Sequence, residues 1–324
     1  MKKRLFSGIQ PSGELHIGNY LGAVENWIKY LDSHDCIYSI VDYHALTVPY
    51  SPAEMPRRIL ELAAMLLACG LTPDRCILFR QSDVLEHTAL AWIFSTVTPI
   101  NYLERMIQFK EKSEHHSAPN TGLFSYPILQ AADILLYRAE VVPVGEDQLQ
   151  HLELSRDVAR KFNQRVDQEY FCDPQPLLSP ARRILGLDGK HKMSKSLNNH
   201  LALSDSPDTL RDKLKRAGTD ERRKRRSDPG EAQDCNIFSF HTYFSTEAEC
   251  AEIAPRCRSA EIGCIDCKIR VAENIAGRLE PIRERYQQWL ARPEDVHAVL
   301  AQGAERARQI ARHTLQEVHG LLGL

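Results

Sequence analysis

Long apolar runs are missing from this sequence of 324 residues. No stretch approaches the roughly 20 consecutive apolar residues that a membrane-spanning helix requires. The opening Met-Lys-Lys-Arg leads into a strand-like segment and not into the long apolar core of a signal peptide. Internal repeats and low-complexity tracts are also missing. We therefore expect a cytosolic protein without a membrane partner.

The chain also lacks a large excess of positive or negative charge. The chain has 41 Lys and Arg against 43 Asp and Glu, a formal net charge of -2. This balance excludes a histone-like, wholly basic protein, but it does not exclude nucleic-acid binding, because charge can be local. With 43% hydrophobic and 26% charged residues, the composition is globular. The length predicts one large domain or about two ordinary ones.

Nine cysteines, an odd number in a chain expected to be cytosolic, do not suit a disulfide framework. Lone cysteines are usually buried or incidental, and we interpret four in this way: Cys36, Cys69, Cys76 and Cys172. The other five fall within the segment from Cys235 to Cys267. Such clustering requires an explanation other than chance burial.

Four of the clustered cysteines form the pattern C-x21-C-x6-C-x2-C: Cys235, Cys257, Cys264 and Cys267. A C-x-x-C pair presents two thiolates to one metal centre, and two more distant cysteines complete four ligands. We therefore predict a metal centre. Structural zinc sites more often pair two C-x-x-C units, so the uneven spacing is less typical of zinc. Cys250 and His241 stay open as further ligands.

The first half of the sequence alternates between strand and helix patterns. We expect strands at Leu5–Gln10, Cys36–Asp42, Arg75–Gln81 and Val141–Val144. Apolar periodicity predicts helices at Ile17–Leu31, Ala53–Cys69, Glu86–Lys112, Leu123–Arg138 and Glu146–Phe162. This order predicts an α/β fold with a Rossmann-type, doubly wound parallel sheet, and such sheets bind ligands at the carboxyl ends of their strands.

After Tyr170 the character of the sequence changes. Phe171–Pro180 holds three prolines and is predicted to be a connector, and Gly186–Asn199 is a polar loop without a period. Beyond Ser206 the pattern is helical almost to the end. We therefore expect one domain over residues 1–200 and an all-helical domain over residues 201–324, with a last helix able to pack back onto the first domain.

Three widely separated segments suit a nucleotide. Gly8–Asn19 combines glycines, which let the backbone approach a ligand, with a helix start that offers N–H groups to a phosphate beside His16. Lys192–Ser196 places two lysines three residues apart, which suits a polyphosphate whose charge rises in the transition state. Pro143–Gln148 ends a strand with acidic residues suited to ribose hydroxyls. Singly, these patterns also suit a tight turn, a solvated loop and an ordinary helix start.

The same segments carry a family resemblance. His16-Ile17-Gly18-Asn19 and, later, Lys192-Met193-Ser194-Lys195-Ser196 resemble the two signature motifs of class I aminoacyl-tRNA synthetases. Further segments look like those of the bacterial tryptophanyl-tRNA synthetase family: Gly8–Gly13, Val41–Ala45, Glu104–Lys112 and Val142–Gln148. The resemblance covers essentially the whole chain. Asn19 stands where many class I enzymes have histidine, a substitution familiar in this family.

The resemblance implies activation of tryptophan with ATP and transfer to tRNA, with a catalytic domain over residues 1–200 and an anticodon-binding domain over residues 201–324. It also implies a homodimer and Mg2+ bound to the ATP phosphates. Catalysis is then expected from positioning and from charge placed where negative charge develops. The implied catalytic residues are His16, Lys112, Lys192 and Lys195. The implied ATP site consists of Gln10, Pro11, Ser12, Gly18, Asn19, Gly145, Glu146, Asp147, Ile184, Lys192, Met193, Ser194, Lys195 and Ser196.

Selection of the amino acid is assigned to the helix predicted after Pro127. Its polar positions share one face, which by itself is more typical of a solvated surface. In the tryptophan enzymes, however, the aspartate that matches Asp133 accepts the indole N–H, and Gln130 stands where many bacterial relatives have methionine. The implied tryptophan site consists of Phe6, Gly8, His44, Tyr126, Gln130, Asp133, Val142, Val144 and Gln148.

Two features of the second half suit tRNA binding. From Arg211 to Asp228, nine Lys or Arg stand against four Asp or Glu, a local basic excess suited to phosphates. The aromatic residues that follow suit core packing or stacking on unpaired bases: Phe238, Phe240, Tyr243 and Phe244. The cysteine pattern is similar to the 4Fe-4S motif of a subgroup of the same family, with zinc as the alternative.

Three other functions stay open from the sequence. One is another adenylyl-transferring enzyme with a His-Ile-Gly-type motif, which does not explain Lys192–Ser196 together with a basic helical domain. Tyrosyl-tRNA synthetase shares the fold and the chemistry. A metal- or redox-sensing nucleic-acid-binding protein accounts for the cysteines and the basic run, but it leaves the nucleotide motifs without a role.

Overall fold

The computed structural model describes residues 2–106, 120–145, 148–178 and 184–324. The chain forms two compact units. The first unit consists of Met1–Ser12, Ala23–Pro180 and Trp289–Leu324, and the second of Gly13–Gly22 and Ala181–Gln288. The division into catalytic and anticodon-binding domains at residue 200 stays a prediction.

A parallel sheet of five strands forms the centre of the first unit, in the order β3-β2-β1-β4-β5. The strands are β1 (Arg4–Ile9), β2 (Asp35–Ile40), β3 (Ile77–Arg80), β4 (Val141–Val144) and β5 (Gln175–Leu178). In register, Leu5 of β1 pairs with Cys36 of β2 on one side and with Val141 of β4 on the other. This order confirms the predicted α/β, Rossmann-type fold.

The prediction that Phe171–Pro180 is only a connector was wrong, because the segment contains β5. Among the described strands, β5 pairs with β4 alone and forms an edge of the sheet. Pro176 is tolerated there, since an edge strand does not need every backbone N–H for a neighbour. The prolines of this segment therefore predicted a connector where the structure has a strand.

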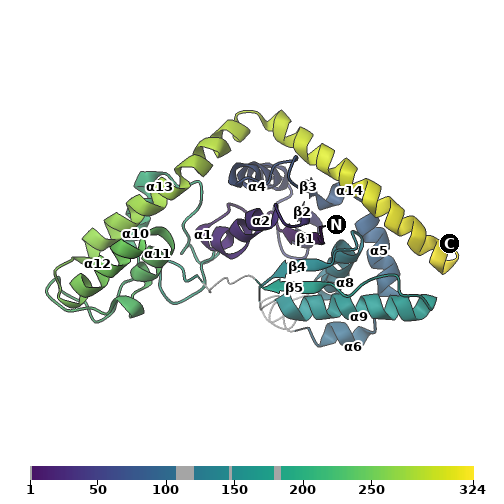
Figure 1. The fold of residues 1–324 in the computed structure, drawn as a ribbon, viewed down its shortest axis with the longest axis horizontal. Coiled ribbons are helices and arrows are strands. Elements are labelled where there is room, and N and C mark those ends of the chain that lie inside the picture. The colour runs from purple at the N-terminus through teal and green to yellow at the C-terminus, as the bar shows by residue number, and fades with distance from the viewer. Residues whose placement is uncertain (1, 107–119, 146–147, 179–183) are drawn as a thin grey trace. The chain divides into compact units, whose positions relative to one another are not determined.

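Helices cover both faces of this sheet. In the first unit they are α2 (Glu25–Tyr30), α3 (Asp42–Ala45), α4 (Met55–Cys69), α5 (Glu86–Ser95), α6 (Ile100–Glu104), α8 (Thr121–Leu135), α9 (Leu149–Val166) and α14 (Pro293–Leu322), with a 3-10 turn, η2 (Gln81–Asp83). α4 contacts β2 and α8 contacts β1, and Figure 1 shows these two helices on opposite sides of the sheet. Right-handed crossovers require this arrangement when the strand order reverses between β1 and β4.

The helix predicted over Glu86–Lys112 is interrupted. α5 ends at Ser95 and α6 begins only at Ile100, directly after Pro99. Proline disfavours helical geometry in the residue before it and cannot donate a backbone hydrogen bond. The apolar pattern continues across the break, which explains why periodicity alone predicted one helix.

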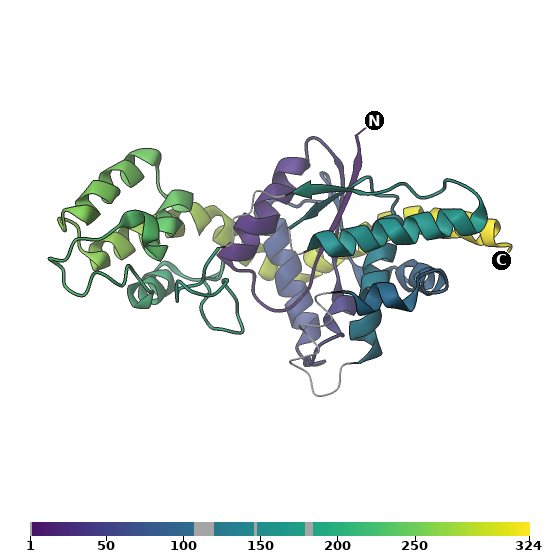
Figure 2. The ribbon, with the colours of Figure 1, turned by 90° about the horizontal axis from the view of Figure 1, so that it is seen from below.

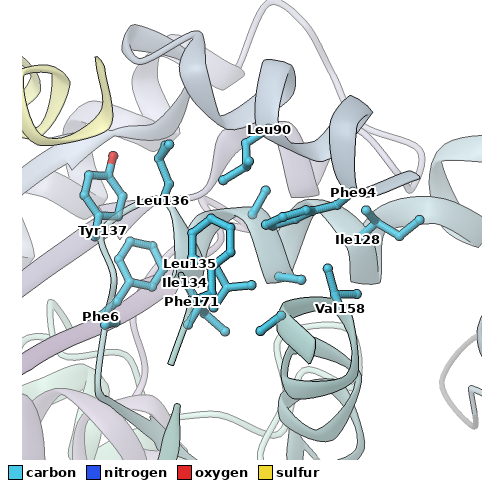
Figure 3. Packing of buried hydrophobic residues seen from close by; sticks show 14 of the residues in the cluster. Phe6, Leu90, Phe94, Ile128, Ile134, Leu135, Leu136, Tyr137, Val158 and Phe171 are labelled. Atoms are coloured by element: carbon cyan, nitrogen blue, oxygen red, sulfur yellow. The ribbon is translucent and has the colours of Figure 1, made fainter. Parts of the chain in front are cut away.

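The core of the first unit lies between the sheet and the helices α5, α8 and α9. Figure 3 shows Phe94, Ile128 and Val158 interdigitating in this layer. The C-terminal helix α14 packs against β3. At Gly303, an added Cβ would lie 1.9 Å from the carbonyl oxygen of Leu78, so glycine is required for this close approach.

The second unit is helical apart from its loops. Its elements are α1 (Ile17–Asn19), α10 (Pro207–Arg216), η4 (Ala232–Asp234), α11 (Asn236–Phe244), α12 (Glu247–Arg258) and most of α13 (Cys264–Leu290). α1 passes into a π turn, η1 (Tyr20–Val24), that leads to α2. Figure 2 shows α10 to α12 in green, grouped with their connecting loops. Among the described residues, no helix is long and apolar enough to span a membrane.

Candidate active site

A cavity of about 320 Å3 lies in the first unit beside β1 and β4. Ligands in doubly wound sheets bind where the strand order reverses, which here is between these two strands. The cavity is lined by Phe6, Ser7, Gly8, Gln10, Val41, His44, Tyr126, Gln130, Asp133, Ile134, Val142, Pro143, Val144 and Gln148. The structure therefore brings together every residue of the predicted tryptophan site.

Asp133 on α8 is the buried acid of this cavity, with an exposed fraction of 2%. Its Oδ2 accepts a hydrogen bond from Nε2 of His44 (2.7 Å), and its Oδ1 accepts from Nδ1 of His87 (2.7 Å) and Nε2 of Gln81 (2.7 Å). Burial raises the pKa of Asp133, but the charge of His44 and the hydrogen bonds from both histidines hold it well below its usual range. Asp133 is therefore an ionised acceptor at neutral pH.

The polar face of α8 lines the cavity, where Gln130 is half-buried. Tyr126 is buried, and its hydroxyl is 2.7 Å from Nε2 of His151. Burial raises the pKa of Tyr126 to about 12, so it stays protonated. The helix also begins before Pro127, at Thr121, because the side chain of Asn120 accepts the N–H of Leu123 and caps it. The helix predicted over Leu123–Arg138 therefore begins two residues earlier than expected and contains Pro127 in its interior.

In the second unit, His16 forms the N-terminal cap of α1. Its Nδ1 accepts the backbone N–H of Asn19 (3.2 Å), while the Asn19 side chain accepts the N–H of His16 (3.3 Å). Because Nδ1 is an acceptor, we assign the proton of the neutral ring to Nε2. Nε2 is thus the nitrogen that can donate to an anion. The turn is held by a hydrogen bond from the N–H of Ile17 to the carbonyl of Leu201 (2.9 Å).

The Lys192–Ser196 loop lies against this turn. Gly13 has φ +114°, and a Cβ added there would lie 3.5 Å from Nζ of Lys195. A Cβ added at Gly18 would lie 3.4 Å from Cβ of Met193. These distances are ordinary van der Waals contacts, so the two signature segments, more than a hundred residues apart in sequence, lie side by side, and it is the positive φ of Gly13 that favours glycine there.

The charges of the loop act on His16. Burial lowers the pKa of His16 to about 4, and the positive charges of Lys195, His200 and Lys192 add to this effect. His16 is therefore neutral at pH 7, and the lysines supply the positive charge. A neutral donor beside two cations suits the oxygens of a polyphosphate.

The depressed pKa of His16 predicts a stability effect. Between pH 6.5 and about 4, the unfolded chain binds a proton at His16 that the folded chain does not bind. Stability is therefore lost as the pH falls through this window. We expect the thermal midpoint of His16→Gln to fall less than that of the natural protein between pH 7 and pH 4.5. Parallel curves in differential scanning fluorimetry would contradict the assignment.

The other predicted ATP-site residues lie at chain turns. The N–H of Ser12 donates to the carbonyl of Gln10 (2.8 Å), with Pro11 between them. Gly145 follows β4, and the carbonyl of Ile184 accepts the N–H of Met193 (2.9 Å). Three predicted residues lie outside the described part of the chain: Lys112, Glu146 and Asp147.

The comparison with known proteins identifies the family. Residues 1–280 match the tRNA synthetases of class I for tryptophan and tyrosine (W and Y). The tryptophan–tRNA ligase of Deinococcus radiodurans is 43% identical over 325 residues, which cover 99% of this chain and 98% of that protein. The chain belongs to the bacterial tryptophanyl-tRNA synthetase family. The Helicobacter pylori (strain J99) tryptophan–tRNA ligase is 44% identical to this synthetase over 329 residues, 100% of this chain and 99% of that protein.

The fold of this synthetase agrees with the same family. The crystal structure of the tryptophanyl-tRNA synthetase from Campylobacter jejuni complexed with ADP and tryptophan matches it with a TM-score of 0.91 at 35% identity. The match covers 99% of this chain and 100% of that chain. The family expected from the signature motifs is therefore confirmed, and the tyrosine and sensor alternatives are not favoured.

Two residues of the synthetase that bind Asp133 were not predicted, namely Gln81 and His87. Both are completely buried. Gln81 follows β3, and His87 lies in the first turn of α5, a largely apolar helix. Polar residues inside apolar segments are the only sequence signal for such partners, because buried polar groups need hydrogen bonds.

The four predicted metal-binding cysteines of the synthetase come from three elements of the second unit. Cys235 precedes α11, Cys257 lies in α12, and Cys264 and Cys267 lie in the first turn of α13. Burial raises the pKa of Cys267 to about 12, and the neighbouring thiolates of the other three add to this effect. Within the residues that the structure describes, no group of three or more His, Cys, Asp or Glu is arranged to hold a metal ion.

The basic run of the synthetase, Arg222–Arg226, lies in a loop, and its cations differ in their contacts. Arg222 binds the carboxylates of Asp220 and Asp234, and NH1 of Arg223 donates to the carbonyl of Ile262 (3.0 Å). The remaining three cations of the run are exposed. Of the aromatic residues that follow, Phe240 and Phe244 are buried and pack in the core, and Phe238 and Tyr243 are half-buried.

Proposed function

We propose that this chain, a tryptophan–tRNA ligase, activates L-tryptophan with ATP and then esterifies its tRNA. A carboxylate oxygen of tryptophan attacks the α-phosphorus of ATP, and the bond to pyrophosphate breaks, which leaves tryptophanyl-adenylate. The terminal ribose hydroxyl of the tRNA then attacks the carbonyl carbon, and AMP leaves. The first step needs no protein base, so the residues act through positioning and charge.

The observation that carries this proposal is the ionised, buried Asp133 in the cavity wall. A buried carboxylate is costly unless it is hydrogen-bonded, and it remains an acceptor for one further donor. The indole N–H of tryptophan is such a donor, whereas phenylalanine has none. A site of this kind rejects an amino acid without the donor by about 10⁴-fold.

The residues that we propose to act on the ATP phosphates belong to the second unit. His16 and Lys195 would stabilise the α-phosphate and the departing pyrophosphate, and Lys192 supports the phosphates. Their support comes from the contacts described above: a neutral Nε2–H donor and two lysine charges act on the same turn. Mg2+ would be held mostly by the ATP phosphates and water.

Amino-acid-dependent ATP–pyrophosphate exchange tests this function. Exchange is measured side by side with tryptophan, tyrosine and phenylalanine. We expect exchange with tryptophan alone. Exchange with tyrosine would move the assignment to the sister enzyme, and no exchange by a folded protein that still binds nucleic acid would favour the sensor function.

We propose that the helical part of the second unit binds the tRNA anticodon. The exposed cations Lys224, Arg225 and Arg226 support contact with phosphates. We also infer a homodimer, as family resemblance implies. Large apolar side chains of the first unit support such a contact, since Trp92 and Ile100 are 73% and 68% exposed.

We further propose that Cys235, Cys257, Cys264 and Cys267 hold a 4Fe-4S cluster, with zinc as the alternative. Four thiolates are the donor set that such clusters use. Glycine is required at position 230 beside Cys257, because an added Cβ would lie 2.9 Å from Sγ of Cys257 and 2.6 Å from Cδ of Arg223. When bound, the cluster would brace the loops of this unit; it takes no part in amino-acid activation. Iron, sulfide and zinc analysis of the purified protein distinguishes the two groups.

If the cluster shapes only the tRNA-binding part, its loss should affect tRNA charging and adenylate formation to different extents. We expect Cys267→Ser to lower tRNA charging more than adenylate formation, because the cluster would shape the tRNA-binding part alone. Cys172→Ser, at an exposed cysteine of the first unit, is the control and should change neither step. Equal loss of both steps in Cys267→Ser, or loss of neither, would count against this expectation.

A further inference from the structure

The hydrogen bonds of Asp133 leave one defined place for a ligand. Each carboxylate oxygen accepts about two hydrogen bonds. Oδ1 already accepts two, from Gln81 and His87, whereas Oδ2 accepts one, from His44. Among the described donors, the protein therefore fills Oδ1 and leaves one acceptor position on Oδ2. The direction of that position depends on how the carboxylate is held.

His87 is itself held from its other side. Its Nε2 lies 2.7 Å from the hydroxyl of Tyr137, and both residues are completely buried. Burial, with the charges of Asp133 and Glu86, raises the pKa of Tyr137 well above its usual value, so the hydroxyl keeps its proton and donates. The contacts thus assign Nε2 of His87 as the acceptor and Nδ1–H as the donor to Asp133.

The two rings are also fixed by packing. Tyr137 stacks on Phe6 with ring centroids 5.4 Å apart, as Figure 3 shows, and His87 stacks on Phe79 with centroids 5.8 Å apart. Neither Tyr137 nor His87 lines the cavity. They contact the cavity wall through Asp133, which His87 binds, and through Phe6, on which Tyr137 stacks.

We propose that Tyr137 and His87 are positioning residues for amino-acid selection, which orient the Asp133 carboxylate so that the open place on Oδ2 meets the indole N–H. This inference rests on the proposed function of Asp133. A hydrogen bond weakens steeply when the donor angle departs from linearity. A carboxylate that is free to rotate would therefore discriminate less between amino acids with and without the N–H donor.

Tyr137→Phe removes one hydroxyl and keeps the stacked ring. In tryptophan-dependent ATP–pyrophosphate exchange, we expect KM for tryptophan to rise about tenfold, the scale of one buried hydrogen bond. KM for ATP and kcat stay unchanged. The preference for tryptophan over 1-methyltryptophan, measured as the ratio of kcat/KM values, falls by a similar factor. The matched control is Tyr38→Phe, which deletes another buried hydroxyl of the first unit, bonded to the carbonyl of Trp27, and leaves all three quantities unchanged.

A pair of His87 variants tests the donor directly. His87→Asn retains an N–H near the position of Nδ1 and should keep more selectivity than His87→Leu, at equal or lower thermal stability. Equal changes in KM for tryptophan and ATP, or lost stability with unchanged selectivity against 1-methyltryptophan, would overturn the inference. Failure of the proposed function looks different, since the natural protein itself would then show no exchange with tryptophan.

Discussion

Replacement of Lys195 by alanine is expected to lower tryptophan-dependent ATP–pyrophosphate exchange by about 10²–10³-fold, the usual loss when one preorganised charge or donor is removed from a transition state. The lysine lies against Gly13 and acts electrostatically on His16. In the proposed reaction, its charge would stabilise the negative charge that develops on pyrophosphate. Steady-state exchange at saturating tryptophan and ATP measures the effect.

The wider polar loop, Gly186–Asn199, which contains Lys192–Ser196, offers a matched control for this prediction. Lys190 is an exposed lysine that pairs with Glu221 (3.2 Å). Lys190→Ala removes the same charge from the same loop and should leave exchange within about twofold, because exposed ion pairs contribute little. Both variants should keep the thermal midpoint of the natural protein. Near-normal exchange by Lys195→Ala would refute the assignment of this loop to the phosphates.

Replacement of Asp133 has the second large expected effect. We expect Asp133→Ala to raise KM for tryptophan by about 100-fold, the scale of a lost hydrogen bond to a charged group, while KM for ATP changes little. The side chain lies in the cavity wall, whereas His16, Lys192 and Lys195, which we propose to act on the phosphates, belong to the second unit. Exchange measured against each substrate in turn separates the two constants.

Loss of folding must be separated from loss of recognition here, because Asp133→Ala strands the donors His44, His87 and Gln81. Asp133→Asn keeps the volume and one acceptor oxygen, so it should unfold less readily while still losing tryptophan affinity. Asp220→Asn, at a buried carboxylate of the second unit, controls for general destabilisation. Unchanged tryptophan dependence in both Asp133 variants would remove this residue from the site.

Prediction from sequence succeeded where the signal is local. The predicted strand Val141–Val144 has the same bounds as β4, because a short run of β-branched residues suits a buried parallel strand. Prediction of an element failed where its local residue pattern gives no sign of the distant segment that it pairs with. β5 is an example, because its prolines suggest a connector until pairing with β4 is known. The break between α5 and α6 was missed for the opposite reason, since apolar residues continue on both sides of Pro99.

The sequence by itself determined the family, the parallel α/β fold and the chemical character of the two signature segments. Glycines, capping residues and lysines act over a few neighbouring positions, so their spacing is enough to recognise them. Only the tertiary structure decided that the polar face of α8 lines the cavity, and that Gln81 and His87 reach Asp133 from 52 and 46 residues away. The physical reason is that periodicity reports which residues share a face, whereas burial and hydrogen-bond partners depend on the segments that pack against that face.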